Sequence, residues 1–370
     1  MRYFLSIITL IIVLVGCDSS QSNGKKDESL LPKAKGKIGE IILVMDSAKW
    51  EGELGNVVRD IFMADVEGLP RPETIFTVRY IDPRKLNSVL KAVTNMIFVT
   101  TFDSNTRGSR VINNYFTKSA RQRIQANENI FLVTDENVFA KGQEVMYLFG
   151  NNEKILINHL KNNSQKLRDH FNSIASKRTE YKLYKAKRVK GIEETLVKNH
   201  DCFMKVPYGY RLAREEDGFI WMRRIDTDVD RDIFIGYTDF DDENIFTNDR
   251  VLDLRHSFTK RYIFDDPEKL ESYVTIQQEA KIFQREVNFF GKYGIESKGL
   301  WKTNNNSMGG PFKSYMFVDE ALNRVYYVEG FVYSPSRKQR ELMREMDVIL
   351  STFRTKSELN TKEEETASTK

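Results

Sequence analysis

The stretch Glu40-Ile-Ile-Leu-Val-Met-Asp46 places five consecutive apolar residues between two acidic ones. An apolar run without alternation is typical of a strand that is buried on both faces, as in a parallel sheet covered by helices. Residues 50–66 follow it with apolar side chains at helical spacing. A buried strand that leads into an amphipathic helix predicts a βα unit, and therefore an α/β fold for this part of the chain.

The alternation of strands and helices continues to residue 178. Further strands are predicted at residues 74–81, 96–100, 129–134 and 145–149, and helices at residues 82–92, 107–125 and 153–178. The connection between the last two strands is short, which favours an antiparallel pair. We therefore predict a three-layer α/β domain over residues 38–185, with a mainly parallel sheet.

The second half of the chain has a different pattern. Short strands separated by polar turns are predicted at residues 203–212, 218–222, 232–237, 286–290, 295–301, 315–318 and 325–333, and helices at residues 249–262 and 335–353. Consecutive strands with short turns favour an antiparallel meander, so we predict an α+β domain over residues 190–354, with helices backing the meander. Residues 355–370 are polar, and we predict a disordered tail.

The N-terminus resembles an export signal. Residues 4–15 are almost entirely apolar and follow Arg2. This run is too short to span a bilayer comfortably, because a span needs about 20 residues. Its ending, Leu14-Val-Gly-Cys17, resembles a bacterial lipobox, which implies a lipoprotein signal peptide at residues 1–16 and lipid attachment to Cys17.

The segment after Cys17 indicates how the protein is held. Residues 17–37 are rich in Ser, Gly, Asn and Lys, which predicts a flexible leash. We expect a membrane-anchored lipoprotein of the bacterial cell envelope, at the outer membrane and facing the periplasm. Asp18 also resembles an inner-membrane retention signal, so the choice of membrane stays open.

Composition and cysteine content exclude some classes of protein. Among 370 residues, Lys+Arg 57 against Asp+Glu 53 gives a net charge of only +4. Dedicated nucleic-acid binders carry a larger and more clustered excess, so we expect no nucleic-acid partner. Once Cys17 carries lipid, Cys202 is the remaining thiol, and no internal disulfide can form. We predict that Cys202 is buried as a small apolar residue.

Acidic residues follow the predicted strands of the first domain. They are Asp46, Asp82, Asp103 and Asp135. Ligands bind at the carboxyl ends of parallel strands, so convergent carboxylates there would suit a metal-dependent hydrolase. The alternative is structural, because Asp is a preferred helix N-cap, and Asp82-Pro83 in particular is typical of a helix start. No glycine-rich phosphate loop follows residue 45, which disfavours nucleotide chemistry.

The second domain offers weaker candidates. Gly309 and Gly310 are predicted to lie in a loop that a ligand or partner could approach closely. Six aromatics could form a platform for glycan or peptidoglycan, or could pack a core: Tyr208, Tyr210, Trp221, Trp301, Tyr326 and Tyr327. The acids of residues 226–232 lack the glycine and glutamate of a calcium-binding EF-hand, and the four histidines are scattered. We predict no metal site and no cofactor.

Several motifs together resemble a lipoprotein family of the Bacteroidota that consists of domains of unknown function. They are the lipobox, residues 40–46, Val206-Pro-Tyr-Gly-Tyr210, Gly299-Leu-Trp301, Met308-Gly-Gly-Pro-Phe312 and Glu329-Gly-Phe-Val-Tyr333. The order of elements in the second half also resembles PsbP-like domains, which implies an accessory or binding module. The leading hypothesis is a non-enzymatic, lipid-anchored envelope protein that binds a protein partner.

Overall fold

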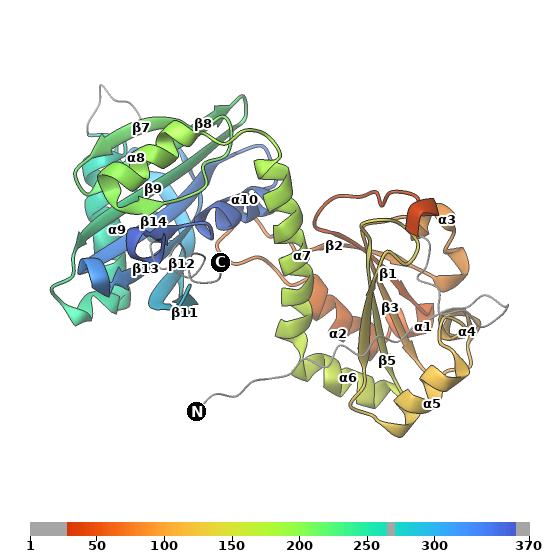
Figure 1. The fold of residues 1–370 in the computed structure, drawn as a ribbon. Coiled ribbons are helices and arrows are strands. Elements are labelled where there is room, and N and C mark those ends of the chain that lie inside the picture. The colour runs from red at the N-terminus through yellow and green to blue at the C-terminus, as the bar shows by residue number, and fades with distance from the viewer. Residues whose placement is uncertain (1–27, 265–270, 360–370) are drawn as a thin grey trace, which may run out of the picture. The chain divides into compact units, whose positions relative to one another are not determined.

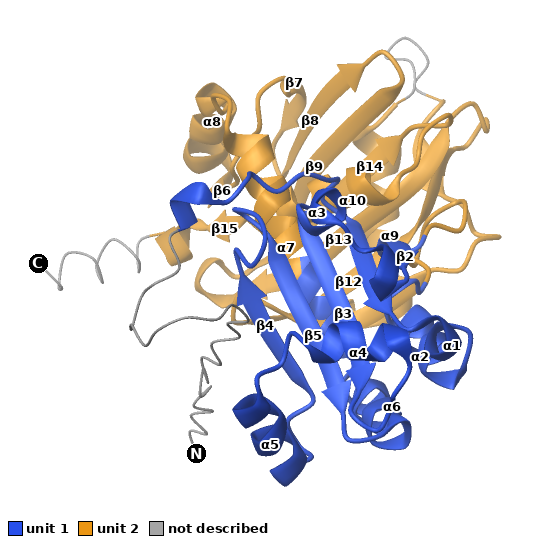
Figure 2. Cartoon of the chain, turned by 90° about the vertical axis from the view of Figure 1, so that its right-hand side faces the viewer, with its two compact units in different colours: residues 1–64, 74–172 blue, residues 65–73, 173–370 orange. Residues whose placement is uncertain are grey.

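The structure is a computed structural model that describes residues 28–264 and 271–359. The chain divides into two compact units (Figure 2). Unit 1 comprises residues 1–64 and 74–172, and unit 2 comprises residues 65–73 and 173–370. The predicted signal peptide and Cys17 lie outside the described residues, as does the tail beyond residue 359.

Unit 1 is built on a sheet that has five strands within the described residues, in the order β2-β1-β3-β5-β4. The strands are β1 (Glu40–Met45), β2 (Thr77–Ile81), β3 (Asn95–Thr101), β4 (Leu132–Glu136) and β5 (Glu144–Gly150). Strands β2, β1, β3 and β5 are parallel, and β4 pairs antiparallel with β5. The predicted α/β class, the mainly parallel sheet and the antiparallel last pair are confirmed.

Helices cover both faces of this sheet, as the consecutive apolar runs predict. They are α1 (Ser47–Trp50), α2 (Glu53–Phe62), α3 (Ser88–Lys91), α4 (Arg107–Asn113), α5 (Lys118–Ala126), α6 (Glu153–Asn162) and the first part of α7 (Ser164–Tyr184). Figure 1 shows α2 and α6 on one side of the sheet and α4 and α5 on the other. On the α4 and α5 side, Ile112 and Ile124 pack onto Ile42 and Phe98 of the sheet.

Three predicted helices of unit 1 are interrupted in the structure. Asp82 caps only a 3-10 turn (Pro83–Lys85), because Leu86 is extended and Asn87 begins α3 with its own cap on Leu90 N. The helix predicted at residues 107–125 breaks before Thr117, whose hydroxyl caps α5. The helix predicted at residues 153–178 is likewise two helices, which meet at Asn163.

The predicted leash is ordered at its end. Within unit 1, the backbone N–H of Ala34 donates to the Lys141 carbonyl at 2.9 Å, and that of Lys35 donates to the Ala92 carbonyl at 2.9 Å. The prediction that residues 17–37 are flexible throughout is therefore wrong for this part, because the backbone there pairs with the body.

Unit 2 contains an antiparallel sheet that has eight strands in the described part of the chain. They are β7 (Arg211–Glu216), β8 (Phe219–Asp226), β9 (Val229–Asp239), β10 (Val274–Ile276), β11 (Phe283–Phe289), β12 (Lys292–Thr303), β13 (Gly309–Asp319) and β14 (Arg324–Tyr333). The order is β10-β12-β13-β14-β9-β8-β7, and β11 also pairs with β12. The predicted antiparallel meander backed by helices is confirmed.

Helices pack on both faces of this sheet. Helices α8 (Lys190–His200) and α10 (Arg340–Leu350) contribute Leu196 and Met346 to one core. Helix α9 (Asn248–Tyr262) contributes Val251 and Phe258 to the other. The apolar pattern predicts no helix at α8 and a single strand at residues 203–212, and both predictions are wrong. Instead, β6 (Cys202–Phe203) pairs with β15 (Arg354–Thr355), and a turn with Gly209 at φ +93° precedes β7.

The short segment at residues 65–73 belongs to unit 2 because it contributes to that core and caps a helix. Leu69 packs against the core that contains Met346. The Glu73 carboxylate accepts hydrogen bonds from the backbone N–H of Gln339 at 2.6 Å and of Arg340 at 3.2 Å. Gln339 supplies no side-chain cap of its own to α10, so a distant residue satisfies this helix start.

Candidate functional site

Asp46 follows β1 at the carboxyl edge of the parallel sheet, and both of its carboxylate oxygens are engaged by the fold. Oδ1 accepts from the Ala48 N–H at 3.1 Å as the N-cap of α1, and Oδ2 accepts from the Thr106 hydroxyl at 2.7 Å. A Cβ at position 108 would lie 2.4 Å from Oδ2, so Gly108 allows this close approach. Asp46 is 5% exposed and acts as a link between two helix starts.

Asp82 is held by its neighbour two residues on. It accepts from the Arg84 backbone N–H at 2.9 Å, and from Arg84 Nε at 2.9 Å and Nη2 at 2.6 Å. These hydrogen bonds from Arg84 lower the pKa of Asp82 below its ordinary value. A bidentate arginine pair leaves this carboxylate little capacity for a metal ion or a substrate proton.

The other two candidate acids do not complete a cluster. Asp103 is exposed and accepts from the Thr101 hydroxyl at 2.5 Å. Asp135 pairs with Val145 at the beginning of β5, because β4 lies at the edge of the sheet and runs antiparallel to β5. Its strand therefore ends at the amino-terminal edge of the parallel strands, opposite to Asp46. The prediction that all four acids share one edge is wrong for Asp135.

Acids and histidines elsewhere are also engaged within the fold. Among residues 28–264 and 271–359, no group of three or more His, Cys, Asp or Glu side chains lies close enough to hold a metal ion. His159 stacks on Phe131 at 4.8 Å, and a His170 ring nitrogen lies 2.7 Å from Glu144 Oε1. Cys202 is free and buried, as predicted, and burial raises the pKa of its thiol.

The glycine pair at residues 309 and 310 is part of a strand. Gly309 pairs with Lys302, and Gly310 pairs with Trp301, so the prediction of an open loop here is wrong. A Cβ on Gly310 would lie 2.0 Å from the Val332 carbonyl oxygen, which also accepts from Trp301 Nε1 at 3.2 Å. The glycine allows tight backbone packing beside the tryptophan, a constraint that composition alone does not distinguish from a loop.

The six aromatics considered for a glycan platform are divided between core and surface. Five are at most 8% exposed and belong to the two cores of unit 2: Tyr210, Trp221, Trp301, Tyr326 and Tyr327. Tyr208 is 68% exposed. A coplanar platform therefore does not form from this set.

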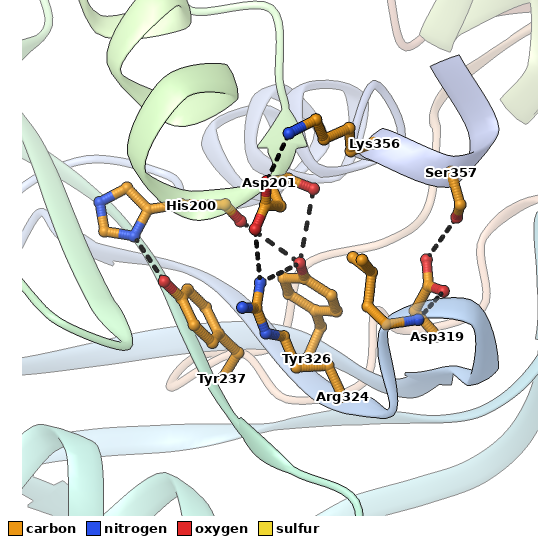
Figure 3. Close-up of polar contacts among 9 residues, drawn as sticks. His200, Asp201, Tyr237, Asp319, Arg324, Tyr326, Lys356 and Ser357 are labelled. Carbon is orange, nitrogen blue, oxygen red and sulfur yellow. Dashed lines mark hydrogen bonds and ion pairs between the residues drawn. The ribbon is translucent and has the colours of Figure 1, made fainter. Parts of the chain in front are cut away.

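A polar cluster around Asp201 was missed by the sequence reasoning (Figure 3). Asp201 ends α8 at φ 50°, and its carboxylate accepts from Lys356 Nζ at 2.9 Å and Arg324 Nη1 at 3.3 Å. The Lys356 hydrogen bond lowers the pKa of Asp201. Ser357 Oγ donates to Asp319 Oδ2 at 2.7 Å. These contacts hold residues 356 and 357, so the prediction of disorder from residue 355 is wrong for this part.

His200 borders the same cluster and is buried. Its Nδ1 lies 3.2 Å from the Tyr237 hydroxyl, and Nε2 lies 3.5 Å from Glu215 Oε1. Burial lowers the pKa of His200, and the charge of Glu215 opposes this shift. With Asp201 paired to Lys356 and Arg324, and Asp319 accepting from Ser357, the cluster is suited to holding the C-terminal segment. Asp directly after a helix can adopt the left-handed conformation, so the end of α8 at Asp201 could have been predicted. Nothing in the sequence of residues 354–357 indicates that they dock here.

The hairpin between β11 and β12 is the second feature that the sequence reasoning missed. Phe289 pairs with Lys292, so Phe290 and Gly291 form a two-residue turn, with φ of 53° and 90°. This is the geometry of a type I′ turn, which Asn-Gly normally fills. In the described chain, the other four non-glycine residues with positive φ are Asn or Asp. A phenylalanine in the left-handed region is a backbone outlier.

The side chain of Phe290 is held in place and exposed. The Arg354 guanidinium lies 3.7 Å from the centre of its ring, and the Phe289 ring lies 4.9 Å away. Phe290 is 45% exposed, and Tyr293 on the following strand is 51% exposed. The signal in the sequence was an aromatic residue directly before the glycine of a tight hairpin. We refer to Phe290 and Tyr293 as the hairpin aromatics.

Comparisons with known proteins identify uncharacterised domains in both halves. A family model described as "Domain of unknown function (DUF8532)" matches residues 34–184, and one described as "Domain of unknown function (DUF4837)" matches residues 190–352. The two matches support an uncharacterised family with two domains. A search of curated proteins finds no match to this chain.

Two solved structures share limited similarity with the chain. One is a mutant of the protein Mog1, at 9% identity over 42% of this chain and 90% of that one, with a TM-score of 0.27. The other is the Ran-binding protein Mog1p of Saccharomyces cerevisiae, at 9% identity over 43% of this chain and 93% of that one, with a TM-score of 0.28.

In the described part of the chain, no helix is long and apolar enough to cross a membrane.

Proposed function

We propose that this chain is a non-enzymatic, lipid-anchored protein of the bacterial cell envelope that binds a protein partner through the hairpin aromatics, Phe290 and Tyr293. In this proposal Cys17 carries the lipid, and the body belongs to the lipoprotein family of the Bacteroidota that the motifs resemble. The PsbP-like order of elements in the second half fits an accessory module of this kind.

The observation that carries the proposal is the strained, exposed Phe290. A residue with a Cβ costs about 1–2 kcal/mol in the left-handed region, and Asn is better tolerated there. Strained residues persist where the surroundings hold them, and they concentrate at functional sites. Phe290 contributes little to a core, since 45% of it faces solvent. Its placement is therefore better explained by binding than by folding.

The surroundings of the hairpin suit a protein interface. Aromatic side chains with few rotatable bonds are enriched at the energetic centres of interfaces, and polar residues form the rim. Arg354 fixes the Phe290 ring, and Phe246 contacts the Tyr293 ring edge-on at 4.9 Å. Lys292, two residues after Phe290, forms an ion pair with Glu358 at 2.8 Å. Aromatic side chains that are already held in place lose little entropy on binding.

The strand-end carboxylates support a non-enzymatic role, because Asp46 and Asp82 serve as helix caps and hydrogen-bond partners within the fold. Asp46 joins two helix starts, and Asp82 is neutralised by Arg84. Groups used as caps and ion pairs are poor candidates for proton transfer, which needs a group that is free to change its charge.

The test is cross-linking and affinity purification of the lipidated protein from its native membrane. We expect Phe290→Asn with Tyr293→Ser to lose one specific partner that the unaltered protein retains. The matched control is Tyr208→Ser, which removes an exposed aromatic from another part of unit 2. If the double variant retains every partner, or if the control loses the same one, the proposed interface is wrong.

The anchor is tested separately by cell fractionation. Cys17→Ser should move the protein from washed membranes to the soluble fraction, because lipid attachment at this residue is the proposed means of anchoring. Metabolic labelling with a fatty acid should mark the unaltered protein and leave the variant unlabelled. A variant that still carries the label would contradict Cys17 as the lipidation site.

A further inference from the structure

An open groove with a volume of about 360 Å³ lies along the C-terminal part of α7, within unit 2. Helix α7 is labelled in Figure 1. The groove is lined by three lysines, two tyrosines and one glutamate: Lys177, Glu180, Tyr181, Tyr184, Lys185 and Lys205. Lys177 and Tyr181 are four residues apart in α7, so the helix presents them on one face, and Lys185 directly follows the end of the helix at Tyr184. The groove is therefore lined mainly by cationic and aromatic side chains.

One wall of the groove is fixed by contacts between α7 and the segment after β6. The Tyr184 hydroxyl donates to the Lys205 carbonyl at 3.0 Å, and Lys205 Nζ lies 3.1 Å from Glu180 Oε1. The same ammonium lies 5.5 Å from the centre of the Tyr184 ring. Lys205 thus neutralises the single acid of the lining and holds the shape of the groove.

The other two lysines leave the groove with an uncompensated positive charge. Within the described residues, neither Lys177 nor Lys185 makes an ion pair, and both are exposed. Lys177 lies about 10 Å from the end of α7 at Tyr184, since each helical residue rises about 1.5 Å, and Lys185 is the next residue. Tyr181 lies between them in the sequence and is 71% exposed. An anion in the groove would meet two ammonium groups and an aromatic ring.

We propose that this groove binds a phosphate-bearing anion, with the headgroup of an anionic phospholipid as its ligand. Lysine binds phosphate as a point charge, and basic residues add attraction to an anionic lipid surface. Tyrosine favours the boundary between headgroups and acyl chains, where its ring is apolar and its hydroxyl is wet. A free polyphosphate would neutralise the lysines but would make no apolar contact with the exposed Tyr181 ring.

The test is co-sedimentation of the full chain, made without lipid as Cys17→Ser, with phosphatidylcholine vesicles that contain or lack phosphatidylglycerol. We expect binding only to the anionic vesicles. Lys177→Gln with Lys185→Gln should weaken it about 30-fold, since each lysine near such a surface adds about fivefold. The control, Lys182→Gln with Lys187→Gln, removes the same charge from exposed positions outside the groove. It should change binding by less than about threefold.

Two further measurements sharpen this test. Glu180→Gln removes the acid of the lining and should tighten binding by about fivefold. Pyrophosphate is added as a soluble competitor. If it binds at Lys177 and Lys185 and displaces the protein from the vesicles, the ligand would be a soluble phosphate and not a lipid headgroup. Equal loss in the control variant, or equal binding to both kinds of vesicle, would overturn the proposal. Because the acyl anchor and Phe290 play no part here, this result stands apart from the proposed function.

Discussion

The two sheets of this protein place their carboxylates in different positions. In unit 1, the strand interiors at residues 41–45, 96–99 and 145–149 are apolar and buried, and acids such as Asp46 and Asp82 follow the strands. In unit 2, three acids lie inside buried strands: Asp232 in β9, Glu296 in β12 and Glu329 in β14. Each of these has an arginine or lysine partner.

The connections explain this difference. Parallel strands require a crossover, usually through a helix, and Asp is favoured at the start of each helix. Antiparallel hairpins need few such caps, so acids in those strands need other partners. The position of an acid along its strand therefore indicates its structural role. Phe290, in contrast, neither caps a helix nor fills a core. We therefore attribute its placement to the proposed binding role.

The largest effect is expected at the buried pair in unit 2. Arg255 and Glu329 are both fully buried, with Nε–Oε2 and Nη2–Oε1 distances of 2.8 and 2.6 Å. Glu329→Gln should cost about 3–5 kcal/mol of unfolding free energy, because it leaves a buried guanidinium without a countercharge. Urea unfolding followed by circular dichroism measures this cost.

The control for this pair replaces both charges. Arg255→Met with Glu329→Leu should be more stable than Glu329→Gln alone, since no buried charge is left unpaired. A cost below about 1 kcal/mol for Glu329→Gln would contradict the importance of the pair.

The next largest effect is a loss of stability at low pH, caused by protonation of Glu296. Burial alone would raise the pKa of Glu296, but the charges of Lys313 and Lys298 and the hydrogen bond from Arg285 outweigh it and lower the pKa to about 2. Between its ordinary value of 4.5 and about 2, the unfolded chain binds more protons than the folded one. Stability should therefore fall as pH drops through this window, by about 3 kcal/mol.

Glu296→Gln tests this dependence, because it removes the titrating group. The stability of the variant should change less than that of the unaltered protein between pH 5 and pH 2.5, measured by thermal unfolding. Asp232 offers a contrast within the same sheet, since burial, opposed by Arg223, raises its pKa to about 7. Asp232→Asn should be relatively more stabilising above pH 7 than at pH 4, the opposite trend.

A smaller effect is expected at the caps of unit 1. Asp46→Ala should cost about 1 kcal/mol, and Asp46→Asn only a few tenths, because Asn caps about equally well. Calcium, magnesium and zinc should leave the melting temperature unchanged. A metal-induced rise that is lost in Asp46→Asn and Asp82→Asn would show that these acids form a site.

The sequence predicted the class and order of both domains because apolar periodicity reports burial directly. It failed where local chemistry competes with periodicity. Asn87 and Thr117 interrupt helices that the apolar spacing would continue, since their side chains cap new ones. The insertion of residues 65–73 into unit 2 depends on Glu73 meeting α10, a contact between residues more than 260 positions apart.

The candidate site was harder to predict because its signals are geometric. Asp46 and Asp82 were correctly recognised as possible caps, but the placement of Asp135 required the direction of β4 relative to the edge. Gly309 and Gly310 have the composition of a loop and the register of a strand. Phe290 is unusual only once its turn is known, because the same dipeptide in a strand or a wider loop carries no strain.

The most direct measurement of the central claim is the unfolding free energy of Phe290→Asn. Relief of the left-handed strain should offset the lost contact with Arg354, which is worth about 0.5–1 kcal/mol at an exposed site. We expect the variant to be as stable as the unaltered protein, or more stable by up to about 1 kcal/mol. A loss of more than about 1 kcal/mol would contradict the account, because Phe290 would then be placed for folding and not for binding.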